Sequence, residues 1–156
     1  MAGNKISKYT RIYDQLEKLT EQCPDPLARM ATINAILYHK MESFSWVGFY
    51  LLKKGQLIVG PYQGHLACQT LEKNKGVCWA GIHEKKTIIV PDVHDFPGHI
   101  ACDSHSQSEI VIPLLNLTGE LTGVMDVDSR LRDNFDTTDG RELEKICKLI
   151  HRKPPD

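Results

Sequence analysis

The chain has 156 residues, of which 41% are hydrophobic and 25% are charged, and its formal net charge is −1. This length suits a single domain, and a balance of 19 basic against 20 acidic residues gives no overall field that would favour nucleic acid or an anionic membrane. No apolar run approaches the roughly 18 residues of a membrane span, and the N-terminal residues lack the pattern of a signal peptide. We therefore expect one domain over residues 1–156, located in the cytoplasm, with no nucleic-acid or membrane partner.

The first half of the chain predicts two helices and a hairpin. The break between the helices lies at Cys23–Pro26, where Asp25 can cap the second helix. From residue 46 the hydrophobic period changes to two, which predicts strands over 46–52 and 56–60 joined by a turn at 53–55. Residues at helical spacing mark the expected inward faces: Tyr9, Ile12, Tyr13, Leu16 and Leu19 in the first helix, and Leu27, Met30, Ala31, Asn34, Leu37, Tyr38 and Met41 in the second.

The second half predicts three more strands and a closing helix. A short helix begins within 76–81, strands cover 87–90, 109–115 and 121–128, and a last helix is capped within 136–139. The segment 91–108 has no clear periodicity, and connections of that length inside a compact domain usually carry function. Helices at both ends of a mostly antiparallel sheet indicate an α+β domain, with the N- and C-terminal helices packed together on one face of the sheet.

Three of the five cysteines stand out. Cys68, Cys78 and Cys102 lie in the middle of the chain near glycines or histidines, whereas Cys147 falls on the apolar face of the last helix and Cys23 lies in the break between the first two. An odd number of cysteines cannot form a fully paired structural framework, and standing disulfides are rare in a reducing compartment. Thiols in such settings can attack, resolve and exchange, so we interpret the three as a redox-catalytic set.

Seven segments between residues 46 and 129 resemble the signature of the free methionine-R-sulfoxide reductases. They are Trp46-Val-Gly-Phe-Tyr50, Gly60-Pro-Tyr-Gln-Gly64 with Ala67-Cys68, Gly76-Val-Cys78, Asp92-Val-His94, Gly98-His-Ile-Ala-Cys102-Asp103, Ser108-Glu-Ile110 and Gly123-Val-Met-Asp-Val-Asp-Ser129. Members of that family are GAF-fold antioxidant oxidoreductases that reduce the free amino acid rather than protein-bound residues. The resemblance implies a GAF-like domain that converts free L-methionine-(R)-S-oxide to L-methionine. It also implies a homodimer, a thioredoxin-type reductant and no cofactor.

The resemblance assigns Cys102 as the nucleophile. A sulfoxide sulfur is electrophilic, and attack by a thiolate leaves a sulfenic acid on the protein. Nearby positive charge favours a thiolate, and the same loop has three histidines that can supply it: His94, His99 and His105. Cys68 follows a glycine-containing segment and is the expected resolving thiol, which would form a disulfide with Cys102. Cys78, at the start of the predicted short helix, remains an alternative resolver or a partner of Cys68.

Three carboxylates and two aromatic residues complete the predicted site. Asp126 and Asp128 are two apart on a strand, so their side chains leave the same face, and Trp46 and Tyr50 share a face in the same way. The resemblance adds Glu109 and implies that all three carboxylates lie at the substrate, where they can hold its α-ammonium group and protonate the departing oxygen. Which of the three is the acid stays open. The aromatic pair is expected to line the pocket for the methyl and thioether groups.

Two other functions fit a GAF-like domain. One is a regulatory module that binds a small ligand or cyclic nucleotide, although we expect no effector domain within 156 residues. The other is a redox sensor whose disulfide reports oxidant to a partner. Turnover of the free substrate with a dithiol distinguishes the enzyme from both. A zinc site made of Cys102 and the nearby histidines would lack the paired spacing of structural zinc sites, so we expect no metal.

Overall fold

The computed structural model describes residues 2–99 and 102–156, so positions 100 and 101 of the motif at 98–103 lie outside the described residues. Five strands form an antiparallel sheet in the order β2-β1-β5-β4-β3. The strands are β1 (Trp46–Lys53), β2 (Gln56–Gln63), β3 (Ile88–Val90), β4 (Ser108–Leu115) and β5 (Leu121–Ser129). The helices are α1 (Ala2–Thr20), α2 (Pro26–Lys40), α3 (Gly76–Glu84) and α4 (Thr137–Cys147), with a 3-10 turn, η1 (Val93–Asp95).

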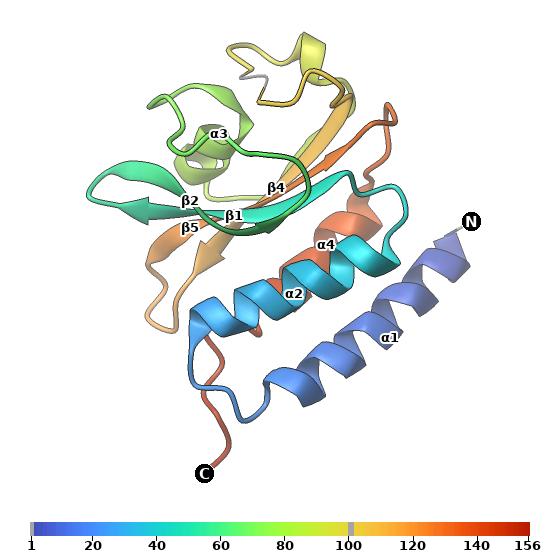
Figure 1. Cartoon of the computed structure of the whole chain (residues 1–156), viewed down its shortest axis with the longest axis vertical. Helices are drawn as coiled ribbons and strands as arrows, with labels where there is room; N and C mark the ends of the chain where they lie inside the picture. The colour runs from blue at the N-terminus through green and yellow to red at the C-terminus, as the bar shows by residue number, and fades with distance from the viewer. Residues whose placement is uncertain (1, 100–101) are drawn as a thin grey trace.

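The helices lie in layers on the two faces of the sheet (Figure 1). α2 packs on β1 and β2, α4 packs on β4, and α1 contacts both α2 and α4. α3 lies on the opposite face, against β3, β4 and β5. The predicted α+β class is thus confirmed, with the N- and C-terminal helices together on one face of the sheet. None of the described helices is both long and apolar enough to cross a membrane.

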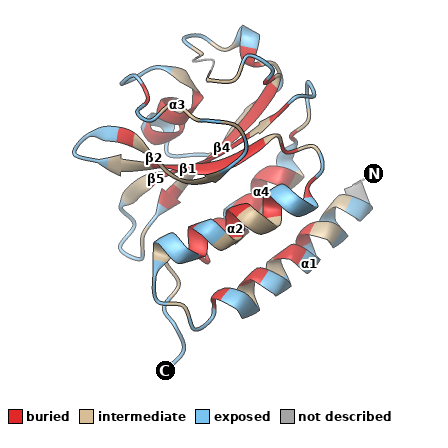
Figure 2. Cartoon of the chain, in the orientation of Figure 1, coloured by how far each residue is buried: buried red, intermediate tan, exposed pale blue. Residues whose placement is uncertain are grey.

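The central strands are buried on both of their faces (Figure 2). Val47 and Phe49 of β1, with Met125 and Val127 of β5, point into the main core beneath α2 and α4. The residues between them point toward α3, where buried apolar side chains are joined by buried carboxylates. Successive strand side chains leave opposite faces. The face covered by α2 and α4 can therefore supply the hydrophobic core, while the face covered by α3 carries polar groups.

The inward faces of α1 and α2 are narrower than the sequence pattern predicted. Four residues expected inside are exposed: Leu19, Leu27, Ala31 and Tyr38. Met30, Asn34 and Leu37 are buried as predicted, and the other buried residues of α2 are Arg29 and Ile33. The guanidinium group of Arg29 donates hydrogen bonds to the carbonyl oxygens of Leu149 and Ile150, just beyond α4. These partners lie at least 120 residues away along the chain, so no local pattern could reveal that an arginine belongs in the core.

The end of β2 and the start of α4 can be compared with the sequence predictions. β2 runs to Gln63 rather than ending at residue 60. It can contain Pro61 because it is an edge strand, where the missing N–H leaves no ladder partner unpaired, and the Pro61 carbonyl accepts a hydrogen bond from the Asn34 amide. Asp136 and Asp139 form a capping box at the start of α4, as the predicted cap within 136–139 required.

Candidate active site

Residues from three neighbouring strands converge on the face of the sheet that α3 covers. Trp46 of β1 pairs with Asp128 of β5, which in turn pairs with Glu109 of β4. Side chains of directly paired residues lie about 5 Å apart on one face. Asp126 is two residues from Asp128, and Tyr50 is four residues from Trp46, so they share this face. The strand register therefore brings together all five strand residues predicted from the sequence.

Cys68 and Cys102 form a disulfide, with their Cα atoms 5.7 Å apart. Cys68 lies in the loop after β2, and Cys102 lies between η1 and β4. The bond thus joins two loops that are 34 residues apart along the chain, and both cysteines remain partly exposed. The expected attacking and resolving thiols are within bonding distance, although the bond does not by itself assign the two roles.

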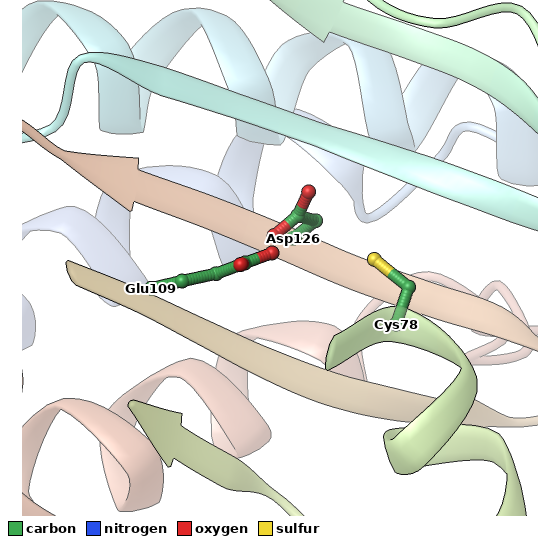
Figure 3. Close-up of side chains that lie close together, drawn as sticks. All are labelled: Cys78, Glu109 and Asp126. Atoms are coloured by element: carbon green, nitrogen blue, oxygen red, sulfur yellow. The ribbon is translucent and has the colours of Figure 1, made fainter. Parts of the chain in front are cut away.

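Cys78 occupies a different position, buried in the first turn of α3. Its sulfur points toward Glu109 and Asp126, and one ligand atom from each of the three residues lies within 4.8 Å of the others (Figure 3). Burial, followed by the neighbouring carboxylates, raises the pKa of the Cys78 thiol well above its ordinary value. Cys78 therefore stays protonated near neutral pH, which makes it a poor nucleophile.

Burial raises the pKa of each of the three carboxyl groups. Like charge on Asp126 and Asp128 adds to the increase for Glu109, and like charge on Asp126 adds to that for Asp128. Hydrogen bonding to Glu109 and Cys78 lowers the pKa of Asp126 but does not cancel the effect of burial. Crowded carboxyl groups in a desolvated site cannot all ionise, so the cluster retains a proton near neutral pH. The site thus holds a proton donor beside negative charge.

Trp46 and Tyr50 form one wall of the site and also hold the loop that carries Cys68. Their rings stack with centroids 5.9 Å apart. The Trp46 indole N–H donates to the carbonyl of His65, and the Tyr50 hydroxyl donates to the carbonyl of Cys68. Gly48 allows this arrangement because a Cβ there would lie 2.5 Å from the Trp46 ring. The polar tips of both aromatics are satisfied, which leaves apolar ring surface toward the site.

In the disulfide-bonded state, these groups line a narrow cavity of about 50 Å³. Cys68 adjoins it through its bond to Cys102. Two buried polar atoms at the cavity have no hydrogen-bond partner among the described residues: Oγ of Ser106 and Oδ1 of Asp126. Unpartnered buried atoms of this kind indicate a place for a polar ligand or water. The predicted residues that line the cavity are Trp46, Tyr50, Cys78, Cys102, Glu109, Asp126 and Asp128.

The sequence and fold of the chain match those of known proteins. A family model described as GAF domain matches residues 31–151. The chain is 39% identical to the free methionine-R-sulfoxide reductase of Saccharomyces cerevisiae, over 96% of this chain and 87% of the relative, and 39% identical to that of Escherichia coli, over 96% and 90%. The X-ray structure of the Neisseria meningitidis reductase with its substrate superposes with a TM-score of 0.87 at 36% identity, over 92% of this chain and 86% of that one.

This chain belongs to the free methionine-R-sulfoxide reductase family. The family resemblance stated from the motifs is therefore confirmed, and so is the GAF fold. The family model begins within α2, and one domain over residues 1–156 stays a prediction. Tyr9, Ile12 and Leu16 of α1 nevertheless pack into the main core.

The three histidines that were expected to supply positive charge near Cys102 differ in position. His99 lines the cavity, with its Nε2 3.8 Å from a carboxylate oxygen of Glu109. Burial, followed by the charge of His94, lowers the pKa of His99, so near neutral pH it carries no positive charge toward Cys102. His94 and His105 are exposed. Their ring nitrogens instead lie at hydrogen-bonding distance from the carboxylates of the aspartates two residues before each of them.

Among the residues that line the cavity but were not predicted from the sequence, two form a contact with each other. Asp103 directly follows Cys102, and His65 precedes Cys68 by three residues. The Nε2 atom of His65 lies 3.3 Å from the Oδ2 atom of Asp103, so the pair connects the two loops that carry the disulfide. Both residues belong to or adjoin the matched motifs, which was the available signal. A motif match does not say which side chains of two distant segments meet.

Proposed function

We propose that the chain reduces free L-methionine-(R)-S-oxide to L-methionine by thiol chemistry. The observation that carries this proposal is the Cys68–Cys102 pair, bonded beside a cavity that contains buried carboxyl groups. The relatives from yeast, Escherichia coli and Neisseria are named for this activity. A module that only binds a ligand needs neither a reversible disulfide nor a proton donor next to it.

In the proposed complex, the α-ammonium group of the substrate lies near the three carboxyl groups, where its positive charge offsets their mutual repulsion. The unpartnered Oδ1 of Asp126 supports a polar ligand at this position. The methyl and thioether groups contact the rings of Trp46 and Tyr50. This leaves the sulfoxide sulfur facing Cys102, which lines the same cavity.

Cys102 attacks the sulfoxide sulfur as a thiolate in the reduced protein. The substrate S–O bond breaks, its oxygen passes to Cys102 as a sulfenic acid, and a carboxyl group supplies the proton; thiolate, sulfoxide and one proton thus give sulfenic acid and methionine. Cys68 then condenses with the sulfenic acid to form the disulfide and release water. The substrate sulfur gains two electrons, and the two cysteine thiols lose two.

A thioredoxin-type dithiol completes the proposed cycle by reducing the disulfide. The partial exposure of Cys68 and Cys102 supports this step, because exchange needs an attacking thiolate to reach one sulfur of the bond. Two parts of the proposal complete it: the protein acts as a homodimer, as the family resemblance implies, and it works in the cytoplasm, as expected from the sequence pattern.

The test is turnover by the full chain with free methionine-R-sulfoxide and either dithiothreitol or a thioredoxin system, with methionine release as the readout. The S epimer and an N-acetylated, C-amidated methionine-R-sulfoxide serve as matched substrates. We expect the free R substrate to be preferred over the blocked one by on the order of a thousandfold, because the blocked compound leaves buried carboxylates without a cation. The S epimer should fail, since inversion exchanges oxygen and methyl between the acidic and aromatic walls.

Two outcomes would contradict the proposal. Absence of methionine release from the free R substrate under either reductant would leave a ligand-binding or redox-sensing module. Equal rates on the free and blocked substrates would contradict the acidic pocket for the ammonium group, even if the thiol chemistry held.

A further inference from the structure

Cys78 is a buried thiol that the proposed cycle does not use, and it faces two acidic groups. Its sulfur and one carboxylate oxygen each from Glu109 and Asp126 lie within 4.8 Å of one another (Figure 3). The three side chains come from three separate elements, α3, β4 and β5. They converge from two sides on one point between the helix and the sheet.

A second observation indicates that this point accepts a positively charged ligand. Asp126 is 94% buried, with 6% of its surface exposed, and its Oδ1 atom has no hydrogen-bond partner among the described residues. The basic group found near Glu109 among the described residues is the imidazole of His99, with its Nε2 atom 3.8 Å from a carboxylate oxygen. No arginine or lysine among the described residues forms a salt bridge with Glu109 or Asp126. Buried acidic groups stay protonated, pair with a cation or bind a metal, and a metal ion can replace the protons that this cluster retains.

We infer that Cys78, Glu109 and Asp126 bind a zinc ion, with water as the fourth ligand. Zinc displaces the proton of a thiol ligand and accepts thiolate and carboxylate ligands in tetrahedral sites, at distances that place the ligand atoms roughly 3.3–3.8 Å apart. The three ligand atoms lie within 4.8 Å of one another, so they need to close by at most about 1.5 Å, which side-chain rotation can supply. Calcium and magnesium need about six or more oxygen ligands, which a thiolate and two carboxylates do not provide. The three ligands are far apart in the chain, so no local motif could indicate this site.

Zinc in this position would compete with the substrate. Glu109 and Asp126 are two of the three groups proposed to hold the α-ammonium group, so both cations cannot occupy them together. This consequence rests on the proposed function, whereas zinc binding itself does not. A chain that binds zinc and lacks reductase activity would retain the inference and lose the proposed function.

The test uses the disulfide-bonded full chain without added dithiol, because Cys68 and Cys102 then cannot bind metal as thiolates. Cobalt(II) replaces zinc as the probe, since thiolate ligation gives it a charge-transfer absorption band in the near ultraviolet. We expect one Co²⁺ per chain, with a band that Zn²⁺ abolishes by displacement. Cys78→Ala should lose the band, and Cys23→Ser, which removes a free thiol in the break between α1 and α2, should keep it.

Loss of the carboxylate alone gives an independent check. Asp126→Asn retains the Cys78 thiol and should weaken Co²⁺ binding at least tenfold, which keeps the inference testable if Cys78→Ala does not fold. The inference is overturned if the wild-type chain shows no thiolate band, if Cys78→Ala keeps the band, or if Asp126→Asn binds Co²⁺ as tightly as the wild type.

Discussion

Cys68 and Cys102 are partly exposed and bonded to each other, whereas Cys78 is enclosed between α3 and the sheet. This difference bears on which thiol resolves the sulfenic acid. A resolving thiol must reach the oxidised sulfur, and Cys68 already lies at bonding distance from Cys102. The raised pKa of Cys78 further reduces its fraction of reactive thiolate. The ranking of Cys68 above Cys78 therefore stays our prediction, now with a geometric reason.

Serine substitutions should separate the two steps of the reaction. Cys102→Ser should abolish methionine release, because a hydroxyl cannot supply the ionised sulfur nucleophile. Cys68→Ser should release about one methionine per chain and then stop cycling with thioredoxin, since the first step needs only Cys102. Rapid-quench measurement of methionine gives both results, and Cys23→Ser serves as the thiol control. Normal thioredoxin cycling by Cys68→Ser together with its loss in Cys78→Ser would reverse our ranking of the resolvers.

The raised pKa of Glu109 also predicts a pH dependence of stability. Burial and the nearby carboxylates raise the pKa of Glu109 in the folded chain, whereas the pKa of a glutamate in an unfolded chain is about 4.3. Between these two values the unfolded chain has lost a proton that the folded chain keeps, so the free energy of unfolding falls as pH rises. Glu109→Gln has no carboxyl group to ionise at this position, so its free energy of unfolding should not include this decrease.

Urea unfolding at about pH 5 and about pH 8 measures the effect, with the disulfide intact in both proteins. We expect the stability of Glu109→Gln relative to wild type to rise between these conditions, by at most about 1.4 kcal/mol per pH unit. A constant difference across the range would show that Glu109 ionises normally in the folded protein.

The two loops that carry the disulfide have a second connection at the scale of elements. His65 and Asp103 approach to 3.3 Å across them. Although burial opposes it, hydrogen bonding to His105 and the charge of His65 lower the pKa of Asp103 overall, so this carboxylate is ionised near neutral pH. This contact is a second link besides the disulfide, and we expect it to hold the loops together after reduction.

Asp103→Asn should therefore slow disulfide formation more than methionine release. A displacement of about 1 Å between reacting groups can cost on the order of a hundredfold in rate, so we expect a tenfold to hundredfold slower second step. Single-turnover assays that follow methionine and free thiols separately measure the two steps. Asp95→Asn, an exposed aspartate of η1, is the matched control. A smaller methionine burst in Asp103→Asn would instead place Asp103 in the first step.

Local patterns were sufficient to predict the order of the elements, and together with the family motifs they indicated seven of the residues that line the cavity. Asp126 and Asp128 share a face because of strand periodicity alone, and the Asp25 cap and the hairpin turn are local signals. Contacts between distant segments could not be predicted in this way. The burial of Arg29 depends on carbonyl groups beyond α4, and the approach of Cys78 to Glu109 and Asp126 depends on how α3 crosses the sheet. Leu27 and Tyr38 lie beside the buried stripe of α2, and periodicity alone does not fix its width.

At the scale of the whole molecule, the disulfide closes a loop that contains α3, β3 and η1. Closing a loop with a separation of 34 residues restricts the unfolded chain and stabilises the folded one by about 4 kcal/mol in the chain-entropy account. For a chain of this size, that corresponds to a Tm roughly 8–16 °C higher in the oxidised form. Thermal unfolding with and without a dithiol tests this, and Cys68→Ser should give one Tm in both conditions. Equal Tm values for the oxidised and reduced wild type would refute it.

The same closed loop links the durability of the protein to the supply of reductant. Every turnover leaves the chain cross-linked, and only a fresh dithiol opens it again. Proteases that act on transiently opened chains cleave in proportion to how often the chain opens. When reductant is scarce, the reductase would therefore accumulate in the disulfide-bonded form, which is degraded most slowly. Oxidant would thus lengthen the lifetime of the protein until a dithiol reduces it again.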